Sequence, residues 1–225
     1  MNLKDKVVLV TGSGSGIGRK TSLVCAEYGA TVIALDINEE AAKLTEKMII
    51  DANGTAMAAK ADITDRVQVH TVIEDVIARF KKIDVLVNNA GSTRLGTMVD
   101  LEDSTYDFII NLNMKGPFIM STEVAKVMIP RRSGRIINIT SYCAVRGEFA
   151  NAPYCMAKAG IKMMTQVQAL ELGQYGISAV AIAPGDTNTE LLQDAFRKRA
   201  ELEGKTIEEV YAAAGKKVPL GRVGE

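Results

Sequence analysis

Apolar segments of strand length alternate with amphipathic segments along the whole chain. The apolar segments cover residues 7–10, 31–35, 85–87, 136–140 and 177–182, with a weaker one at 56–61. The clearest amphipathic stripe repeats at steps of three and four and consists of Val69, Val72, Ile73, Val76, Ile77 and Phe80. This alternation predicts an α/β fold, in which a parallel sheet is covered by helices on both faces.

The helices that connect these strands can be placed from the same pattern. Helices are expected at 17–28, 38–53, 69–80 and 154–172, and a further long helix carries Asn111 and Asn113. No repeat, linker or low-complexity segment interrupts the pattern. Residues 1–225 are therefore expected to form a single domain.

Composition and charge mainly exclude functions. Lysine plus arginine and aspartate plus glutamate number 27 each, so no overall field favours nucleic acid as a partner. The longest apolar runs are far shorter than a membrane span, and the N-terminal residues lack the apolar region of a signal peptide. Three cysteines without CxxC spacing and a single histidine, His70, argue against a disulfide framework, a metal site and a Ser-His nucleophile. The cytoplasm is the expected location.

Candidate chemistry lies between Ser141 and Lys158. Tyr154 and Lys158 are four residues apart, so a helix places them on one face. Ser141 follows the strand at 136–140, and the carboxyl ends of parallel strands open onto the ligand crevice. The three side chains are predicted to converge there as an acid/base, a cation and a positioning hydroxyl.

A tyrosine needs a nearby cation to act near neutral pH, because the ordinary pKa of its phenol is about 10. A cation about 4 Å away contributes roughly the 4 kcal/mol that would bring this pKa near 7. Lys158 is the nearest cation that a helix would hold beside Tyr154, so it is expected to lower the pKa of the phenol. The alternative is a buried tyrosine beside a lysine on an ordinary helix.

A second motif, residues 11–18 (TGSGSGIG), joins the first predicted strand to the first helix. Its spacing is G-x-x-x-G-x-G and differs from the common G-x-G-x-x-G, because Ile17 stands where the third glycine would fall. Glycines let the backbone approach a pyrophosphate, and a helix N-terminus favours the anion. The motif indicates a dinucleotide site, with a purely structural turn as the alternative.

Asp36 ends the second predicted strand and refines the choice of cofactor. A carboxylate at this position can accept hydrogen bonds from the adenosine ribose and would repel a 2′-phosphate. Neither Ser15 nor Ile37 supplies a cation to hold that phosphate. NAD is therefore expected in preference to NADP. A turn or helix-capping aspartate is the alternative.

Taken together, these motifs resemble those of the short-chain dehydrogenase/reductase family over nearly the whole chain. The matching elements are Thr11-Gly12-x-x-x-Gly16-Ile17-Gly18, Asp62, Asn88-Asn89-Ala90-Gly91, Asn113, Ser141, Tyr154-x-x-x-Lys158 and Pro184-Gly185. The resemblance implies a Rossmann-type doubly wound parallel sheet in three layers, with strand order 3-2-1-4-5-6 and the usual seventh strand absent. It also implies NAD-dependent hydride transfer between a secondary alcohol and a ketone.

The resemblance assigns roles to individual residues. Tyr154 is the implied acid/base, and Lys158 lowers its pKa and binds the nicotinamide ribose. Ser141 orients the substrate oxygen, and Asn113 holds a water that extends the proton relay. The implied cofactor-binding residues are Gly12, Ser15, Gly16, Ile17, Gly18, Asp36, Asp62, Ile63, Asn88, Ala90, Gly91, Tyr154, Lys158, Pro184, Gly185, Thr187 and Thr189. No metal is implied, and Thr187 departs from the apolar residue usual in relatives.

The C-terminal part departs further from the family. Residues 190–217 correspond to its substrate-covering helices, and their mixture of apolar and charged residues predicts an amphipathic, mobile segment. Relatives continue past the segment 219–225 into another helix and a seventh strand. The strand at 177–182 is then expected to be an open sheet edge. Either the natural product is longer or a partner chain covers this edge.

The substrate implied by the resemblance is a small polyol, a sugar or an acetoin-like ketone. One alternative is an enzyme like the 3-oxoacyl-(acyl-carrier-protein) reductases, which generally prefer NADP. An alternative of another class is a non-catalytic nucleotide-binding scaffold or regulator. The resemblance also implies a homo-oligomer, a dimer or a homotetramer, that uses the long helices. The candidate interface residues, which ordinary core packing would also use, are Val124, Val127, Met128, Met163, Met164, Val167 and Leu170.

Overall fold

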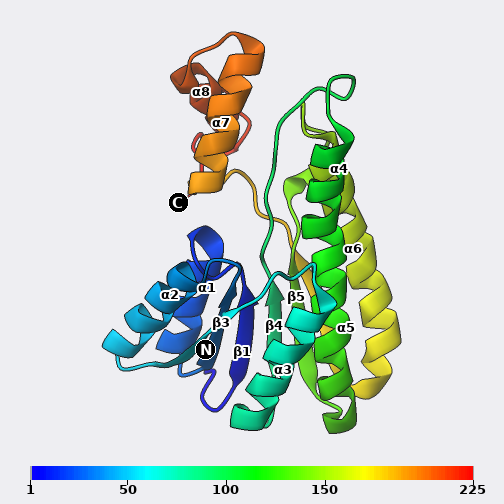
Figure 1. Cartoon of the computed structure of the whole chain (residues 1–225). Coiled ribbons are helices and arrows are strands. Elements are labelled where there is room, and N and C mark those ends of the chain that lie inside the picture. Colours follow the sequence, from blue (N-terminus) through cyan, green and yellow to red (C-terminus); the bar gives the residue numbers. More distant parts are fainter. Residues whose placement is uncertain (1, 225) are drawn as a thin grey trace.

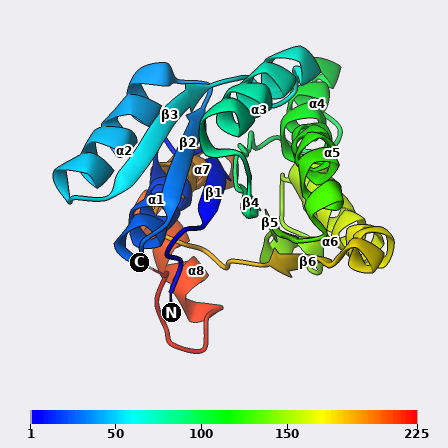
Figure 2. The same ribbon diagram turned by 90° about the horizontal axis from the view of Figure 1, so that it is seen from below.

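Six parallel strands form the sheet in the computed structural model, which describes residues 2–224. The strands are β1 (Val7–Thr11), β2 (Thr31–Asp36), β3 (Thr55–Lys60), β4 (Val85–Asn88), β5 (Gly134–Ile139) and β6 (Ile177–Ile182). Their order across the sheet is β3-β2-β1-β4-β5-β6, and each neighbouring pair is parallel (Figures 1 and 2). This order confirms the predicted doubly wound, Rossmann-type α/β fold.

Helices cover both faces of the sheet (Figure 2). One face packs against α1 (Gly16–Glu27) and α2 (Glu39–Asp51), and the other against α3 (Arg66–Phe80), α5 (Gly116–Met128) and α6 (Ala152–Leu172). Strand side chains alternate between the two faces. Val8 and Val10 of β1 therefore join the core on the α1 and α2 face, while Val7 and Leu9 join the core on the opposite face. Burial on both faces explains why the central strands are apolar throughout.

The long helix expected around Asn113 is interrupted. It consists of α4 (Asp103–Ile110), a π-helical turn η1 (Asn111–Lys115) and α5. The N–H of Gly116 bonds the carbonyl of Asn111, five residues earlier. The next residue, Pro117, has no N–H to donate to an α-helical bond, which favours the wider turn here. Hydrophobic spacing cannot reveal such a turn, and the expectation of one regular helix is corrected.

Two C-terminal helices, α7 (Glu190–Glu203) and α8 (Ile207–Lys216), stand beyond the carboxyl ends of the strands (Figure 1). They pack on each other through a small core of their own, made by Phe196, Ala200, Val210 and Ala214. The rings of Phe196 and Tyr211 meet edge to face at 4.7 Å. The expected amphipathic character of 190–217 is therefore present. None of the helices within residues 2–224 combines the length and the apolar content that a membrane span requires.

Strand β6 is the outermost strand on its side of the sheet. Its side chains Val180 and Ile182 are 43% and 50% exposed. Within residues 2–224 no seventh strand pairs with it. The expected open edge is therefore present in the described part of the chain.

The candidate active site

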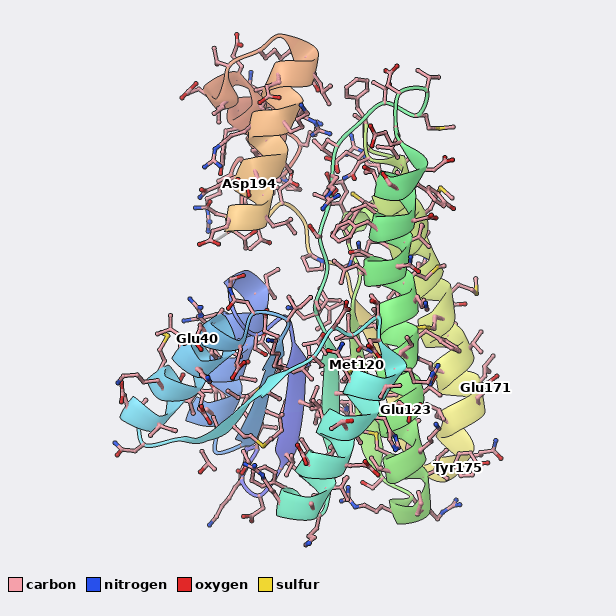
Figure 3. The ribbon with its side chains drawn as sticks, viewed as in Figure 1. Glu40, Met120, Glu123, Glu171, Tyr175 and Asp194 are labelled. Carbon is pink, nitrogen blue, oxygen red and sulfur yellow. The ribbon has the colours of Figure 1, made fainter. Side chains whose placement is uncertain are left out.

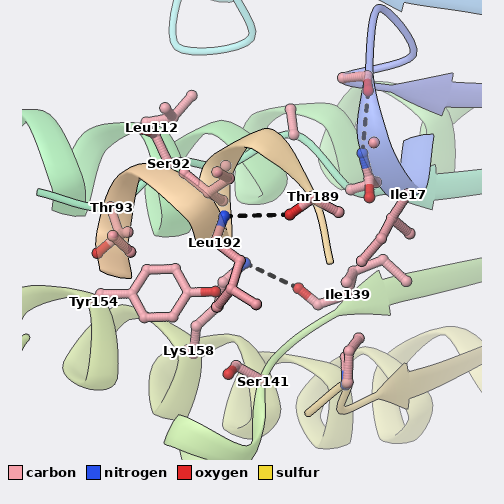
Figure 4. Close-up of a pocket in the computed structure, with 18 of the residues that line it drawn as sticks. Ile17, Ser92, Thr93, Leu112, Ile139, Ser141, Tyr154, Lys158, Thr189 and Leu192 are labelled. Atoms are coloured by element: carbon pink, nitrogen blue, oxygen red, sulfur yellow. Dashed lines mark hydrogen bonds between the residues drawn. The ribbon is translucent and has the colours of Figure 1, made fainter. Parts of the chain in front are cut away.

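A cleft of about 680 Å³ opens at the carboxyl ends of the strands. Its walls are the turns that follow β1 to β6 and the first part of α7 (Figure 4). Because the strands are parallel, these turns lie at the same end of the sheet. Most residues that the sequence predicts for the site therefore line one cleft.

The glycine turn forms the part of the cleft beside α1. Gly12 has a φ of +66°, and a β-carbon on it would lie 2.8 Å from the α-carbon of Ala90. A β-carbon on Gly18 would lie 2.0 Å from the carbonyl oxygen of Gly12, so helix and turn pack without a gap. The first turn of α1 has no acidic residue, and the side chain of Ser15 does not cap it. Its leading N–H groups therefore suit an anion.

Asp36 lies at the end of β2 and lines the cleft. Its Oδ2 accepts a hydrogen bond from the N–H of Gly14 at 2.8 Å, and its Oδ1 accepts one from the N–H of Asn38 at 2.9 Å. The carboxylate thus braces the glycine turn, as the turn interpretation expects, and it also lines the cleft, where a cofactor could reach it. Asp62 and Ile63, which follow β3, line the same cleft.

Tyr154 and Lys158 lie one turn apart on α6 and line the cleft together with Ser141 (Figure 4). The Nζ of Lys158 is 5.4 Å from the centre of the Tyr154 ring and donates a hydrogen bond to the carbonyl of Ile139 at 3.0 Å. The side chain of Lys158 is buried. The hydroxyl of Ser141 accepts a hydrogen bond from the N–H of Cys143 at 3.2 Å. A phenol, a hydroxyl and an ammonium therefore meet in one cleft.

The pKa of Tyr154 is raised, and the expectation that Lys158 alone brings it near 7 is wrong for the chain by itself. Burial is the largest cause, because it disfavours the phenolate. The Cys143 thiol raises the pKa further, and a hydrogen bond with Ser141 offsets a part. Burial also lowers the pKa of Lys158 to about 8. Keeping Lys158 charged therefore costs free energy, which limits how far this residue can lower the pKa of the Tyr154 phenol.

Asn113 lies in the π-helical turn behind the cleft and is fully buried. Its Nδ2 donates hydrogen bonds to the carbonyls of Ser92 and Ile109, at 2.8 and 2.9 Å, while its Oδ1 has no partner among the described residues. A β-carbon on Gly91 would lie 2.6 Å from this Oδ1 and 3.4 Å from the Nζ of Lys158. Both polar atoms therefore face the same glycine, and Oδ1 is left free to accept a hydrogen bond.

The side chain of Asn88 does not line the cleft. It is buried, and its Nδ2 donates to Ser121 Oγ at 2.9 Å and to Asn138 Oδ1 at 2.8 Å. Gly18 likewise lies behind the cleft wall rather than in it. The residues of the segment after β4 that do line the cleft are Asn89, Ala90 and Gly91.

The loop after β6 forms the opposite wall, with Pro184, Gly185, Thr187 and Thr189. Thr187 forms a parallel bridge with Gly224, so the C-terminal segment holds this loop. The hydroxyl of Thr189 caps α7 by accepting a hydrogen bond from the N–H of Leu192 at 3.3 Å (Figure 4). The loop and α7 are therefore joined at the edge of the cleft.

Sequence reasoning missed a polar cluster around Glu148 that also lines the cleft. Glu148 accepts hydrogen bonds from the Tyr142 hydroxyl at 2.9 Å and from Asn151 Nδ2 at 3.0 Å, and it pairs with Arg199 at 3.0 Å. The acidic residue lies between two recognised motifs, but the position of its partner on α7 gives no local signal. Contact between such distant residues requires the fold.

A doubly wound sheet with a glycine turn after its first strand and a tyrosine–lysine pair in the facing cleft is the arrangement of a dinucleotide-dependent oxidoreductase. Residues 6–200 match the family model described as short chain dehydrogenase. The chain therefore belongs to the short-chain dehydrogenase/reductase family. Members of this family are oxidoreductases that bind a nicotinamide cofactor and act on CH–OH groups.

Known proteins resemble the chain over nearly its full length. It is 37% identical over 230 residues to the 3-oxoacyl-[acyl-carrier-protein] reductase FabG of Thermotoga maritima, covering 100% of this chain and 87% of the relative. It is 39% identical over 223 residues to the galactitol 2-dehydrogenase of Agrobacterium fabrum, covering 99% and 86%. The crystal structure of an NAD⁺-bound xylitol dehydrogenase superposes with a TM-score of 0.96 at 30% identity, covering 100% of this chain and 88% of that one.

Proposed function

We propose that the chain is an NAD-dependent oxidoreductase that interconverts a secondary alcohol and a ketone on a small polyol, sugar or acetoin-like substrate. The observation that carries this proposal is the convergence of Ser141, Tyr154 and Lys158 on the cleft that also contains the glycine turn and Asp36. The similarity to galactitol and xylitol dehydrogenases supports the substrate class. The three cysteines are free, which suits the proposed cytoplasmic location.

The residues of the cleft fit a nicotinamide dinucleotide. The N-terminus of α1 would hold the pyrophosphate, and Asp36 the hydroxyls of the adenosine ribose. Asp62 and Ile63 would contact the adenine, and the loop 184–189 the nicotinamide end. When bound, the cofactor supplies the acceptor or the donor of the hydride.

The proposed proton path runs through the residues around Tyr154. In the oxidation the Tyr154 oxygen takes the hydroxyl proton of the alcohol, and in the reduction it returns a proton to the ketone oxygen. Ser141 hydrogen-bonds the same substrate oxygen, while Lys158 binds the nicotinamide ribose. The Oδ1 of buried Asn113, which has no partner within residues 2–224, supports a water there, which would link Lys158 to solvent.

The polar side chains of the cleft favour a hydroxyl-rich substrate. Thr93 and Asp186 line it in addition to the proposed catalytic residues, and the Thr93 hydroxyl, which donates to Asn151 Oδ1, can still accept a hydrogen bond. Such groups can satisfy the hydroxyls of a polyol or sugar, which a long acyl chain does not carry. The similarity to the T. maritima reductase makes a 3-oxoacyl thioester the second candidate substrate.

A substrate screen tests this proposal. Polyols, sugars and small diketones are assayed beside a 3-oxoacyl thioester, each with NAD(H) and with NADP(H). We expect the highest kcat/KM for a polyol, sugar or small ketone with NAD(H). A higher kcat/KM for the thioester would select the second candidate, and turnover of no alcohol or ketone would reject both.

Removing the charge of Asp36 is expected to weaken the preference for NAD. Asp36→Asn keeps an acceptor for the N–H of Gly14 but removes the repulsion of a 2′-phosphate. We expect the ratio of kcat/KM for NADP⁺ over NAD⁺ to rise about tenfold or more, which corresponds to about 1.4 kcal/mol. Asp51→Asn, at an exposed carboxylate near the end of α2, is the control and should leave the ratio unchanged. An unchanged ratio in Asp36→Asn would refute the assignment.

We also propose a homo-oligomer, but with a smaller interface than the sequence suggests. Val124 and Met128 are fully buried in the core, so their assignment to an interface is corrected. Met163, Val167 and Leu170 on α6 are 59%, 43% and 82% exposed and remain candidates. Light scattering is expected to give at least twice the 24.2 kDa of one chain, and a monomer mass would reject the proposal.

A further inference from the structure

Glu148 is the centre of a polar cluster that joins three segments around the cleft. Its carboxylate accepts hydrogen bonds from Tyr142, directly after Ser141, and from Asn151, the N-cap residue of α6. Its Oε2 also lies 3.3 Å from the Sγ of Cys143, and its Oε1 lies 3.0 Å from Arg199 of α7. One carboxylate therefore contacts the loop that carries Ser141, the start of the helix that carries Tyr154, and the helix that covers the cleft.

Arg199 supplies the polar contacts that run from α7 to this loop. Its NH2 group bonds Glu148 and also the carbonyl of Phe149, at 3.3 Å. The side chain is 10% exposed, so the pair with Glu148 is largely desolvated. The apolar core of α7 and α8, by contrast, is internal to these two helices. Arg199 therefore adds a direct polar contact between α7 and this loop, besides the attachment of α7 to the β6 loop through Thr189.

The charge of Glu148 makes this contact sensitive to the position of α7. Asp186 lies close enough to Glu148 for the two carboxylates to repel each other. Burial and the charge of Glu148 together raise the pKa of Asp186. Burial raises the pKa of Glu148, but the hydrogen bonds that Glu148 accepts from Asn151 and Tyr142 lower it, and the positive charge of Arg199 lowers it further. The net result is a lowered pKa of Glu148. If α7 moved away, a buried carboxylate would lose its counter-ion beside another acidic group, which is costly.

We propose that Glu148 is a positioning residue that couples the closing of α7 over the cleft to the arrangement of the Ser141 and Tyr154 segments. With α7 closed, Arg199 compensates the carboxylate, and Glu148 holds Tyr142 and Asn151 in place. With α7 open, the carboxylate loses the Arg199 charge, and the Tyr142 and Asn151 segments lose their tie to α7. Substrate enters the open form, and the residues align for proton transfer only in the closed form. The catalytic consequence rests on the function proposed above. The contact between Glu148 and Arg199 that holds α7, which we call the latch, does not.

The test compares Arg199→Met, Glu148→Gln and the double variant with the wild-type chain. Arg197→Met is the matched control, because Arg197 lies on the same helix but pairs within it, with exposed Asp194. Hydrogen exchange of the α7 amides is measured without substrate or cofactor. We expect exchange to rise about tenfold or more in Arg199→Met and in Glu148→Gln, and to stay unchanged in Arg197→Met.

Kinetics on the best substrate of the screen provide the second readout. In Arg199→Met and Glu148→Gln we expect kcat to fall about tenfold or more, and the double variant to lie within about threefold of the poorer single variant. Unchanged α7 exchange in both single variants would overturn the latch, even if the chain turned over no alcohol or ketone. Kinetic effects that multiply in the double variant would overturn the coupling. Thermal unfolding of each variant identifies a loss that comes from misfolding, and Glu148→Gln, which keeps the side-chain shape, remains informative if Arg199→Met does not fold.

Discussion

Tyr154→Phe is expected to lower kcat by about 10²–10⁴-fold on any alcohol or ketone that the wild-type chain turns over, because it removes the proposed proton donor and acceptor. The ring remains, so the packing of α6 is preserved. Binding of NADH, followed by the enhancement of its fluorescence, should therefore persist. The free energy of unfolding should change by about 1 kcal/mol or less, the usual net contribution of one hydroxyl hydrogen bond.

Tyr175→Phe is the matched control for this substitution. It removes a tyrosine hydroxyl in the short turn just beyond the C-terminal end of α6, which is the end away from the cleft (Figure 3). It should leave both kcat and KM as in the wild-type chain. Substantial turnover by a well-folded Tyr154→Phe protein would contradict the acid/base assignment. A loss of NADH binding along with activity would instead indicate that the phenol serves mainly to shape the cleft.

Much of this site can be predicted from the sequence because its chemistry is local. Tyr154 and Lys158 share a helix face by spacing alone, and the glycine turn lies between a strand and a helix that hydrophobic pattern identifies. Asp36 is placed by the end of β2. Parallel strands then bring these separate motifs to one edge of the sheet without any further information.

The remaining features depend on packing between distant parts of the chain. The side chain of Asn88 turns away from the cleft because Ser121 and Asn138, on neighbouring elements, offer it buried hydrogen bonds. Val124 and Met128 share an apolar pattern with surface residues, and only the position of α5 on the sheet assigns them to the core. Nothing in the local sequence relates Glu148 to Arg199.

Electrostatics shows the same limit at the centre of the site. Spacing correctly places an ammonium one turn from the phenol, but it carries no information on burial. The structure desolvates both groups, and desolvation disfavours the charged form of each. The energy of the Tyr154–Lys158 pair is therefore dominated by the surrounding protein rather than by the two charges alone.

Lys158→Met is expected to remove a pH-dependent part of the stability, because the chain holds this ammonium at a cost. The folded pKa of Lys158 is about 8, below its ordinary value of 10.5. Between these values the unfolded chain binds more protons than the folded one, so this residue makes the free energy of unfolding rise with pH. From pH 7 to pH 9.5 the contribution of Lys158 to the free energy of unfolding should become more stabilising by about 2 kcal/mol.

Urea unfolding at pH 7 and pH 9.5 measures this contribution when wild type and Lys158→Met are compared. Groups that do not interact with Lys158 cancel. The Cys143 thiol interacts with Lys158, and its raised pKa acts in the opposite direction in this range, so the difference reports Lys158 together with this interaction. The carbonyl of Ile139 loses its partner in the variant, but that cost does not depend on pH. Lys162→Met, at an exposed position one turn further along α6, is the control and should match the wild-type pH dependence. Equal pH dependence in wild type and Lys158→Met would mean that the ammonium is well solvated, and a solvated ammonium could not serve as the inner link of a buried proton path.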